Sequence, residues 1–313
     1  MANQMTADSR VVADELRTDP GVRFGEALIR VFVLVCGVFV VASTVLVIAF
    51  LARTGLKGIA EAGLWQLVAH AVWKPEANLY GGLPLIVGTV TSATGAVLIG
   101  AAPAVLTALW VIEFAPKSFR ASFRRLMEVA SAVPSVVYGW LALAYLVPRM
   151  EDVARVIYGP EAQVGGEGLA SASVLLGVMI IPTVLILSLD SLARVHPSLR
   201  DASAALGASP LQTAFRVVLP GAWRGLLVAV FFGLARAAGE TMAVQMVIGG
   251  ARMLASNAFS PTTTISTQIV MDMQNAMPGT PASNALYAMS LILLTLSSGV
   301  VLVTRAISGQ RVA

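Results

Sequence analysis

Few charged residues, few histidines and a single cysteine limit what this chain can be. Charged residues make up only 12% of its 313 residues, whereas soluble domains carry roughly 25%. The lone cysteine, Cys36, excludes an intrachain disulfide. His70 and His196 are far apart and lack paired cysteine or carboxylate spacing, so they do not indicate a metal site. The chain also lacks the Gly-x-x-x-x-Gly-Lys-Ser/Thr pattern, so we do not expect it to hydrolyse nucleotides.

Long hydrophobic runs are what the sequence has in abundance. Hydrophobic residues make up 57% of the chain, and a helix needs about 20 mostly apolar residues to cross a membrane. Six runs meet this requirement, at 31–51, 83–112, 127–146, 169–189, 226–248 and 286–303. We therefore expect an all-α polytopic membrane protein with about six transmembrane helices, built as one domain over residues 26–308.

Arginine and lysine predict the orientation of these spans. They are dense before the first run, after the second and after the fourth, which places those segments in the cytoplasm. Both termini are then cytoplasmic, and residues 1–25 are expected to form a flexible tail. Glu113 and Asp190 fall at cytoplasmic span ends, where we expect them to be solvated. The net charge of +4 is explained by this topology and does not indicate a nucleic-acid partner.

The predicted cytoplasmic segment 194–220 has a helix, break, helix pattern. Pro197 starts a short helix and Gly207 ends it, and Ser209-Pro210-Leu211-Gln212 begins a second helix with a capping-box pattern and proline at the first helical position. A short helix outside the bilayer that presents small residues can bind in the groove of a soluble partner. The alternative is an ordinary helical hairpin between two spans.

Arg236 and Glu240 lie within the fifth run, where charge is rare. Four residues apart on one helix, they would share a face and pair. An arginine near the middle of the membrane costs about 2.5–3.5 kcal/mol, which makes the pair a candidate functional site. Arg236 could neutralise an oxyanion in transit, because its planar donor fork suits phosphate-like oxygens. Glu240 would then hold Arg236 in place when the path is empty. The alternative is a structural pair that joins spans.

Prolines and small residues shape the other runs. Pro103, Pro134 and Pro182 each remove a backbone donor, so we expect each to kink or break its helix, either beside a cavity or as a packing feature. Between residues 53 and 82 a short amphipathic helix is expected at the membrane interface. The polar segment 251–285 either dips back into the membrane or forms an external gate. Small residues recur every four positions in the second run and predict close approach of another helix: Gly88, Ser92, Ala96, Gly100 and Ala104.

Several segments together resemble the permeases of phosphate-specific ABC transporters, the PstC family. In the coupling motif of such permeases, an acidic residue and two small ones precede a glycine and a Leu-Pro pair. These places hold Asp201, Ala202, Ser203, Gly207, Leu219 and Pro220. Asp201 replaces the usual glutamate and Ser203 the usual second alanine. The continuation Gly-Glu-Thr-Met-Ala-Val at 239–244 is similar to PstC and differs from the usual ending in the sister PstA subunits. Segments 80–89, 133–139 and 179–183 also match the family.

The resemblance implies a type I ABC importer permease fold and ATP-driven import of inorganic phosphate across the bacterial cytoplasmic (inner) membrane. The implied partners are a homologous second permease (PstA-like), an ATPase dimer (PstB-like) that docks on the coupling motif, and an extracytoplasmic phosphate-binding protein (PstS-like). ATP and Mg would be bound by the ATPase, so no cofactor is expected on this chain, which would not be an enzyme. The implied substrate path contains Arg236, Glu240 and Thr241, with helix-break or pathway candidates at Pro134, Ser135, Tyr138 and Pro182.

Two other functions are compatible with the sequence. A permease of the same fold could carry another oxyanion, such as sulfate or molybdate. The chain could also be a secondary transporter driven by an ion gradient, although the inverted repeats typical of that class are not evident.

Overall fold

The computed structural model describes residues 20–159 and 165–308. Contacts within the chain divide it into two compact units, residues 1–53 and residues 54–313. Helix α2, Pro20–Ala62, contributes to both. Within the first unit the described side chains of α2 are almost all exposed and mostly apolar, as in a helix that faces lipid or another subunit. The predicted tail, residues 1–25, falls outside the described residues as far as position 19.

Among the residues that the structure describes, four long helices and two bent helix pairs correspond to the predicted spans. The long helices are α2, α4 (Leu83–Glu113), α8 (Leu169–Ala193) and α15 (Pro281–Ser308). The first bent pair, with an angle of 84°, joins α5 (Lys117–Ala132) to α6 (Ser135–Leu141), the π-helical segment η2 (Ala142–Leu146) and α7 (Val147–Tyr158). The second, with an angle of 70°, joins α10 (Pro210–Thr213), the π-helical segment η3 (Ala214–Val218) and α11 (Leu219–Gly221) to α12 (Trp223–Gly239). Counting each bent pair as one span gives six, as the sequence predicts.

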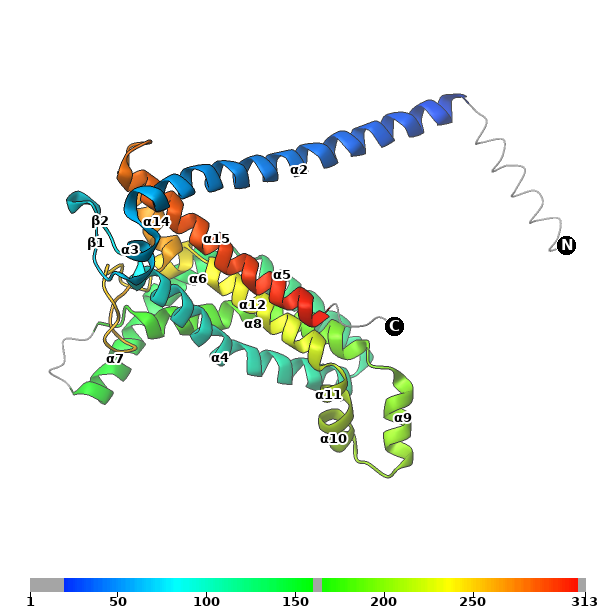
Figure 1. The fold of residues 1–313 in the computed structure, drawn as a ribbon. Coiled ribbons are helices and arrows are strands. Elements are labelled where there is room, and N and C mark those ends of the chain that lie inside the picture. Colours follow the sequence, from blue (N-terminus) through cyan, green and yellow to red (C-terminus); the bar gives the residue numbers. More distant parts are fainter. Residues whose placement is uncertain (1–19, 160–164, 309–313) are drawn as a thin grey trace. The chain divides into compact units, whose positions relative to one another are not determined.

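The short elements of the second unit gather at the two ends of its long helices (Figure 1). At one end lie α9 (Pro197–Ala205) and α10. At the other end lie α3 (Leu64–Ala69), α14 (Ile265–Met273) and an antiparallel hairpin of β1 (Trp73–Lys74), η1 (Pro75–Ala77) and β2 (Leu79–Tyr80). The amphipathic helix predicted between residues 53 and 82 corresponds to α3, which buries Leu67.

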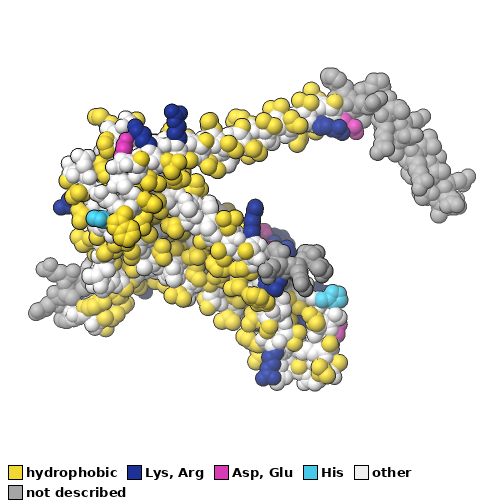
Figure 2. Space-filling model, in the orientation of Figure 1, with side chains coloured by type: hydrophobic (Ala, Val, Ile, Leu, Met, Phe, Trp, Pro, Cys, Tyr) yellow, Lys and Arg dark blue, Asp and Glu magenta, His cyan; other side chains and the backbone are white. Residues whose placement is uncertain are grey.

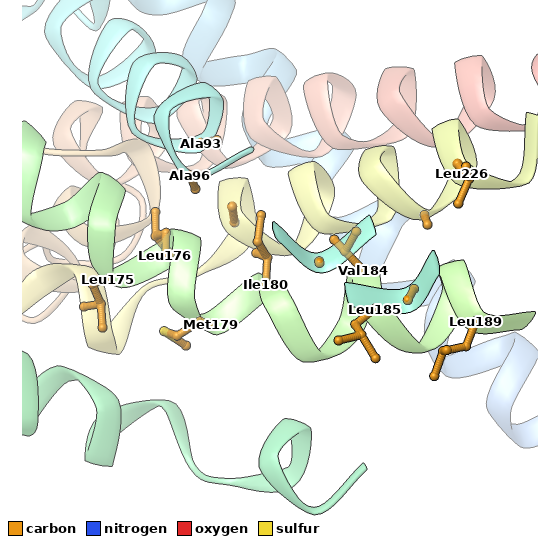
Figure 3. Packing of buried hydrophobic residues seen from close by; sticks show 14 of the residues in the cluster. Ala93, Ala96, Leu175, Leu176, Met179, Ile180, Val184, Leu185, Leu189 and Leu226 are labelled. Carbon is orange, nitrogen blue, oxygen red and sulfur yellow. The ribbon is translucent and has the colours of Figure 1, made fainter. Parts of the chain in front are cut away.

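The larger core lies between α4, α8 and α12. Among the described helices, α4 and α8 make the most extensive contact. The approach is close, because a Cβ added at Gly100 would lie 2.3 Å from the carbonyl oxygen of Gly177. Every residue of the predicted small-residue stripe is buried, so the expected helix approach is confirmed. Figure 3 shows Ile180 and Val184 of α8 directed toward α12, where Gly233 leaves room for their side chains.

A second, smaller core lies beneath the hairpin. Its apolar members come from α3, the hairpin, α4, α14 and α15: Leu67, Trp73, Tyr80, Leu85, Ile265, Ala285, Leu286, Ala288 and Met289. At the edge of this smaller core, the Asp272 carboxylate joins the hairpin to the segment that precedes α14. Asp272 Oδ2 accepts a hydrogen bond from Trp73 Nε1 at 2.8 Å, and Oδ1 accepts one from Arg252 Nη2 at 2.6 Å. Asp272 belongs to α14, the helix within the polar segment 251–285, and α14 packs against α15 and α4.

The prolines differ in their effect on the helices. The chain bends between α5 and α6 immediately before Pro134, and Tyr138 Oη donates a hydrogen bond across the bend to Ala130 O at 3.0 Å. By contrast, α4 continues through Pro103 and α8 through Pro182, so neither proline breaks its helix. Both helices are packed on each other along the core, and these neighbours hold the backbone helical where the proline removes one hydrogen bond.

The outer surface of the second unit is itself apolar. On the face seen in Figure 2, hydrophobic side chains are spread over the whole unit and charged side chains are few. Leu98 on α4 is 75% exposed and Trp140 on α6 is 59% exposed. Apolar surface of this extent is unfavourable in water and favourable against lipid or another membrane subunit.

Candidate functional site

Residues 194–220, named here the coupling loop after the role that the sequence predicts for them, have the predicted helix, break, helix structure. α9 ends at Ala205, and Gly207 adopts φ 79°, a left-handed conformation that glycine reaches without strain. Ser209 Oγ accepts a hydrogen bond from Gln212 N at 3.3 Å, and Gln212 Oε1 accepts one from Ser209 N at 2.9 Å. These two bonds form the predicted capping box at the start of α10.

The residues of the coupling motif divide into an inner and an outer set. Ser203 is buried, and its Oγ lies 2.8 Å from Thr213 Oγ1, so it joins α9 to α10 inside the loop. Leu219 is half-buried. Beside the motif, Leu206 is 89% exposed and Leu211 is 59% exposed, which gives the loop an apolar surface that a partner protein can cover. The exposed motif residues are Asp201, Ala202, Gly207 and Pro220.

Glu113 and Asp190 are both ion-paired, and the expectation of solvation is wrong for Glu113, whereas the Asp190 side chain stays 36% exposed. Arg200 Nη2 of α9 lies 2.9 Å from Glu113 Oε1, and the Glu113 side chain is only 11% exposed. Arg124 Nη1 of α5 donates to Asp190 Oδ1 at 2.5 Å. The partners are 87 and 66 positions apart in the sequence, so helix periodicity carries no information about either pair.

Arg236 and Glu240 do not form the predicted helical pair. α12 ends at Gly239, and Glu240 follows in an extended conformation with φ −70° and ψ 134°, so the two side chains do not share a helix face. In the part of the chain that the structure describes, no carboxylate lies within ion-pair distance of Arg236. Arg236 is exposed and occupies the last turn of α12, where the helix dipole favours a cation.

The Glu240 carboxylate binds backbone N–H groups instead. Its Oε1 accepts from Thr241 N at 3.2 Å and from Ala243 N at 3.4 Å, at the start of α13 (Met242–Gln245), where half-buried Thr241 is the N-cap. The Glu240 carbonyl oxygen accepts from Ser266 Oγ of α14 at 3.0 Å. The positive charge and the negative charge are therefore stabilised by separate parts of the backbone.

The structure brings two of the predicted segments together. α6 packs against α13, and a Cβ added at Gly139 would lie 2.9 Å from the Cα of Ala243. The helix break with Pro134, Ser135 and Tyr138 thus adjoins the segment that contains Glu240 and Thr241. Pro182 lies within the continuous helix α8 and is not part of this break.

Sequence reasoning missed several polar contacts around these segments. The end of α12 has a local signal, because Gly239 is followed two positions later by threonine at an N-cap place. The contacts of Arg200 and Ser266 join distant segments and have no such signal. Within residues 20–159 and 165–308, no three His, Cys, Asp or Glu side chains lie close enough to hold a metal ion.

Curated relatives share most of this chain. It is 33% identical over 286 residues to the probable ABC transporter permease protein YqgH of Bacillus subtilis, with 90% of each chain covered. It is 28% identical over 310 residues to the phosphate transport system permease protein PstC of Mesorhizobium japonicum, with 91% of this chain and 94% of the relative covered. It is 34% identical over 224 residues to PstC 1 of Mycobacterium tuberculosis, with 67% and 66% covered.

A solved structure with a similar fold and a matching family model both come from membrane components of transporters. A solved structure of a bacterial alginate ABC transporter, in complex with an alginate pentasaccharide-bound periplasmic protein, has a chain with TM-score 0.53 and 15% identity, covering 91% of this chain and 97% of that one. Residues 104–312 match the binding-protein-dependent transport system inner membrane component. The chain is thus a multi-pass membrane permease with a type I ABC importer fold, and it is not itself an enzyme. It belongs to the family of binding-protein-dependent transport system inner membrane components.

Proposed function

We propose that this permease moves inorganic phosphate inward across the bacterial cytoplasmic membrane. Relatives named as phosphate transport permeases support this cargo, whereas the name of the Bacillus subtilis relative states none. The energy would come from ATP hydrolysed by a separate subunit. No cofactor is needed on this chain, since ATP and Mg would be bound by that subunit.

The observation that carries the proposal is the guanidinium of Arg236, which has no carboxylate partner among the described residues. It is exposed in the last turn of α12, and Glu240 is engaged by the backbone N–H groups of Thr241 and Ala243. An arginine without a carboxylate partner can offer its planar donors to two oxygens of a phosphate ion. Glu240 and Thr241, at the start of α13, would line the same path.

Three partners complete the transporter that we propose. An ATPase dimer of the PstB kind would dock on the coupling loop through Asp201, Ala202 and the exposed apolar residues around Gly207. A PstA-like second permease would pack against the apolar faces of this chain, so that the phosphate path lies between the two permeases. An extracytoplasmic phosphate-binding protein of the PstS kind would deliver the ion to the outer face.

Phosphate uptake by the complete reconstituted complex tests the proposal. We expect uptake that requires ATP, and a loss of about 10- to 100-fold in Arg236→Met, since a hydrogen bond to a charged group contributes about 1.5–3 kcal/mol. Arg305→Met is the matched control, because Arg305 is also exposed and also lies in the last turn of a helix. It should transport like the wild type.

Two results would overturn the proposed cargo or energy source. Preferential transport of sulfate or molybdate, with phosphate failing to compete, would identify another oxyanion as the cargo. Uptake that continues without ATP and follows an imposed ion gradient would identify a secondary transporter. Normal phosphate uptake by Arg236→Met would remove Arg236 from the path.

A further inference from the structure

The guanidinium of Arg200 joins the coupling loop to the ends of two long helices. Nε and Nη2 donate to Glu113 Oε1 at 3.1 and 2.9 Å, at the end of α4. Nη1 donates to Val195 O at 2.6 Å and Nη2 donates to Leu192 O at 3.3 Å, at the end of α8. One side chain of α9 therefore binds a carboxylate at the end of α4 and two carbonyl oxygens, one in the last turn of α8 and one just beyond it.

This joint is largely shielded from water. The side chains of Arg200 and Glu113 are 25% and 11% exposed. Separating them would leave a shielded carboxylate without a cation, and it would remove the hydrogen bond that Arg200 donates to Val195 O. A carboxylate at a helix C-terminus is also unfavourable unless a cation compensates it. The joint should therefore persist when the coupling loop moves.

The position of this joint allows a movement of the coupling loop to reach α4 and α8. The backbone of α9 contacts α10 and η3, within the coupling loop itself. α4 and α8 are packed together through the small-residue stripe, so a displacement of their ends is carried along both helices. Because the coupling loop is bonded to the ends of both helices, its displacement can move α4 and α8 together as one rigid body.

We infer that Arg200 is the positioning residue that transmits movement of the coupling loop to α4 and α8. This inference rests on the proposed function, in which a separate ATPase moves the loop. Arg200 acts through Glu113 and through the carbonyl oxygens at the end of α8, and it need not contact the ATPase. Without it, the loop would move while α4 and α8 stay in place, so ATP would be hydrolysed without transport.

The test measures phosphate uptake and ATP hydrolysis in the same reconstituted vesicles. For Arg200→Met we expect phosphate moved per ATP to fall at least about tenfold, while the hydrolysis rate changes less than about twofold. Arg200→Lys keeps the charge and should restore part of the ratio. The matched control is Arg124→Met, which breaks the half-exposed pair with Asp190 between α5 and α8 and leaves the coupling loop untouched. Its ratio should equal that of the wild type.

A distance measurement gives a readout that does not depend on the cargo. Spin labels at the exposed positions Leu199 on α9 and Leu106 on α4, in a Cys36→Ala background, report whether the loop and α4 move together. In the complex with wild-type Arg200 the distance should be the same with and without ATP, and in Arg200→Met it should change on ATP binding. If Arg200→Met does not fold, Glu113→Leu removes the oxygen that Arg200 binds on α4 and provides the same comparison.

Several results would overturn the inference. These are an unchanged phosphate-to-ATP ratio in Arg200→Met, an equal fall in Arg124→Met, and a label distance that changes with ATP when Arg200 is present. Failure of Arg200→Met to retain the ATPase during purification would make Arg200 a docking residue instead. Failure of the proposed function is distinguishable, because the complex with native Arg200 would then take up no phosphate with ATP while the label distances still report on the joint.

Discussion

Substitution of Gly207 separates backbone strain from crowding in the coupling loop. Gly207 has φ 79°, and this left-handed conformation costs L residues roughly 1–2 kcal/mol. A Cβ at this position would meet no other atom within 4 Å, so a clash inside the chain adds nothing to that cost. In Gly207→Val the native turn should therefore be disfavoured by about 1–2 kcal/mol, which lowers its population relative to alternative turns about 5- to 30-fold.

The assay is ATP-driven phosphate uptake by the reconstituted complex, with thermal unfolding of the purified complex measured in parallel. In Gly207→Val, phosphate uptake should fall in proportion to the population of the native turn. Without that turn, α9 and α10 would no longer be held in the arrangement that docks the ATPase. Gly207→Asn is the matched control, since asparagine enters the left-handed region more readily than other L residues and should keep most of the uptake. Normal uptake by Gly207→Val would refute the reasoning. An equal loss in Gly207→Asn would show that the ATPase requires an empty position, whatever the backbone conformation.

Two further predictions test the packing and electrostatics of the second unit. Gly100→Ala places a Cβ 2.3 Å from Gly177 O and should lower the free energy of unfolding by about 1–3 kcal/mol in a denaturant titration, whereas Gly37→Ala, with open space around it, should not. Burial, and secondarily the charge of Glu61, raises the pKa of Tyr80 above 10.0. The ultraviolet titration difference between wild type and Tyr80→Phe should therefore have its midpoint above pH 10.0, and Glu61→Gln should lower it. Because the neutral phenol is the form favoured by folding, its contribution to stability is present below pH 10.0 and is lost as the pH rises through the raised pKa.

Features with local determinants were predictable from the sequence. The capping box at Ser209 and the turn at Gly207 depend on residues within a few positions of each other. The approach of α4 and α8 was also predictable, because small residues on one helix face permit it whichever helix is the neighbour. The six spans were predictable because the thickness of the bilayer sets the length of an apolar run that can cross it, and each such run is continuous in the sequence.

Features that depend on distant segments were not predictable in this way. The partner of Glu113 lies on α9, and the sequence contains no periodic signal for a contact between segments 87 positions apart. The end of α12 at Gly239 was missed for a different reason. The apolar run continues to residue 248, and hydrophobicity alone does not distinguish one long helix from two helices separated by a capped break.

The two arginines at the centre of these proposals differ in a way that bears on their roles. Arg200 is mostly buried and binds a carboxylate, as expected of a charge whose task is to join helices. Arg236 is exposed, and α12 ends before the chain reaches Glu240, so the carboxylate nearest in sequence is held by backbone N–H groups. A purely structural Arg236 would keep only the favourable helix dipole in that arrangement and would lose the ion pair that a continuous helix would have allowed. Keeping the guanidinium unpaired does favour a transient oxyanion, which would otherwise have to displace Glu240 before it could bind.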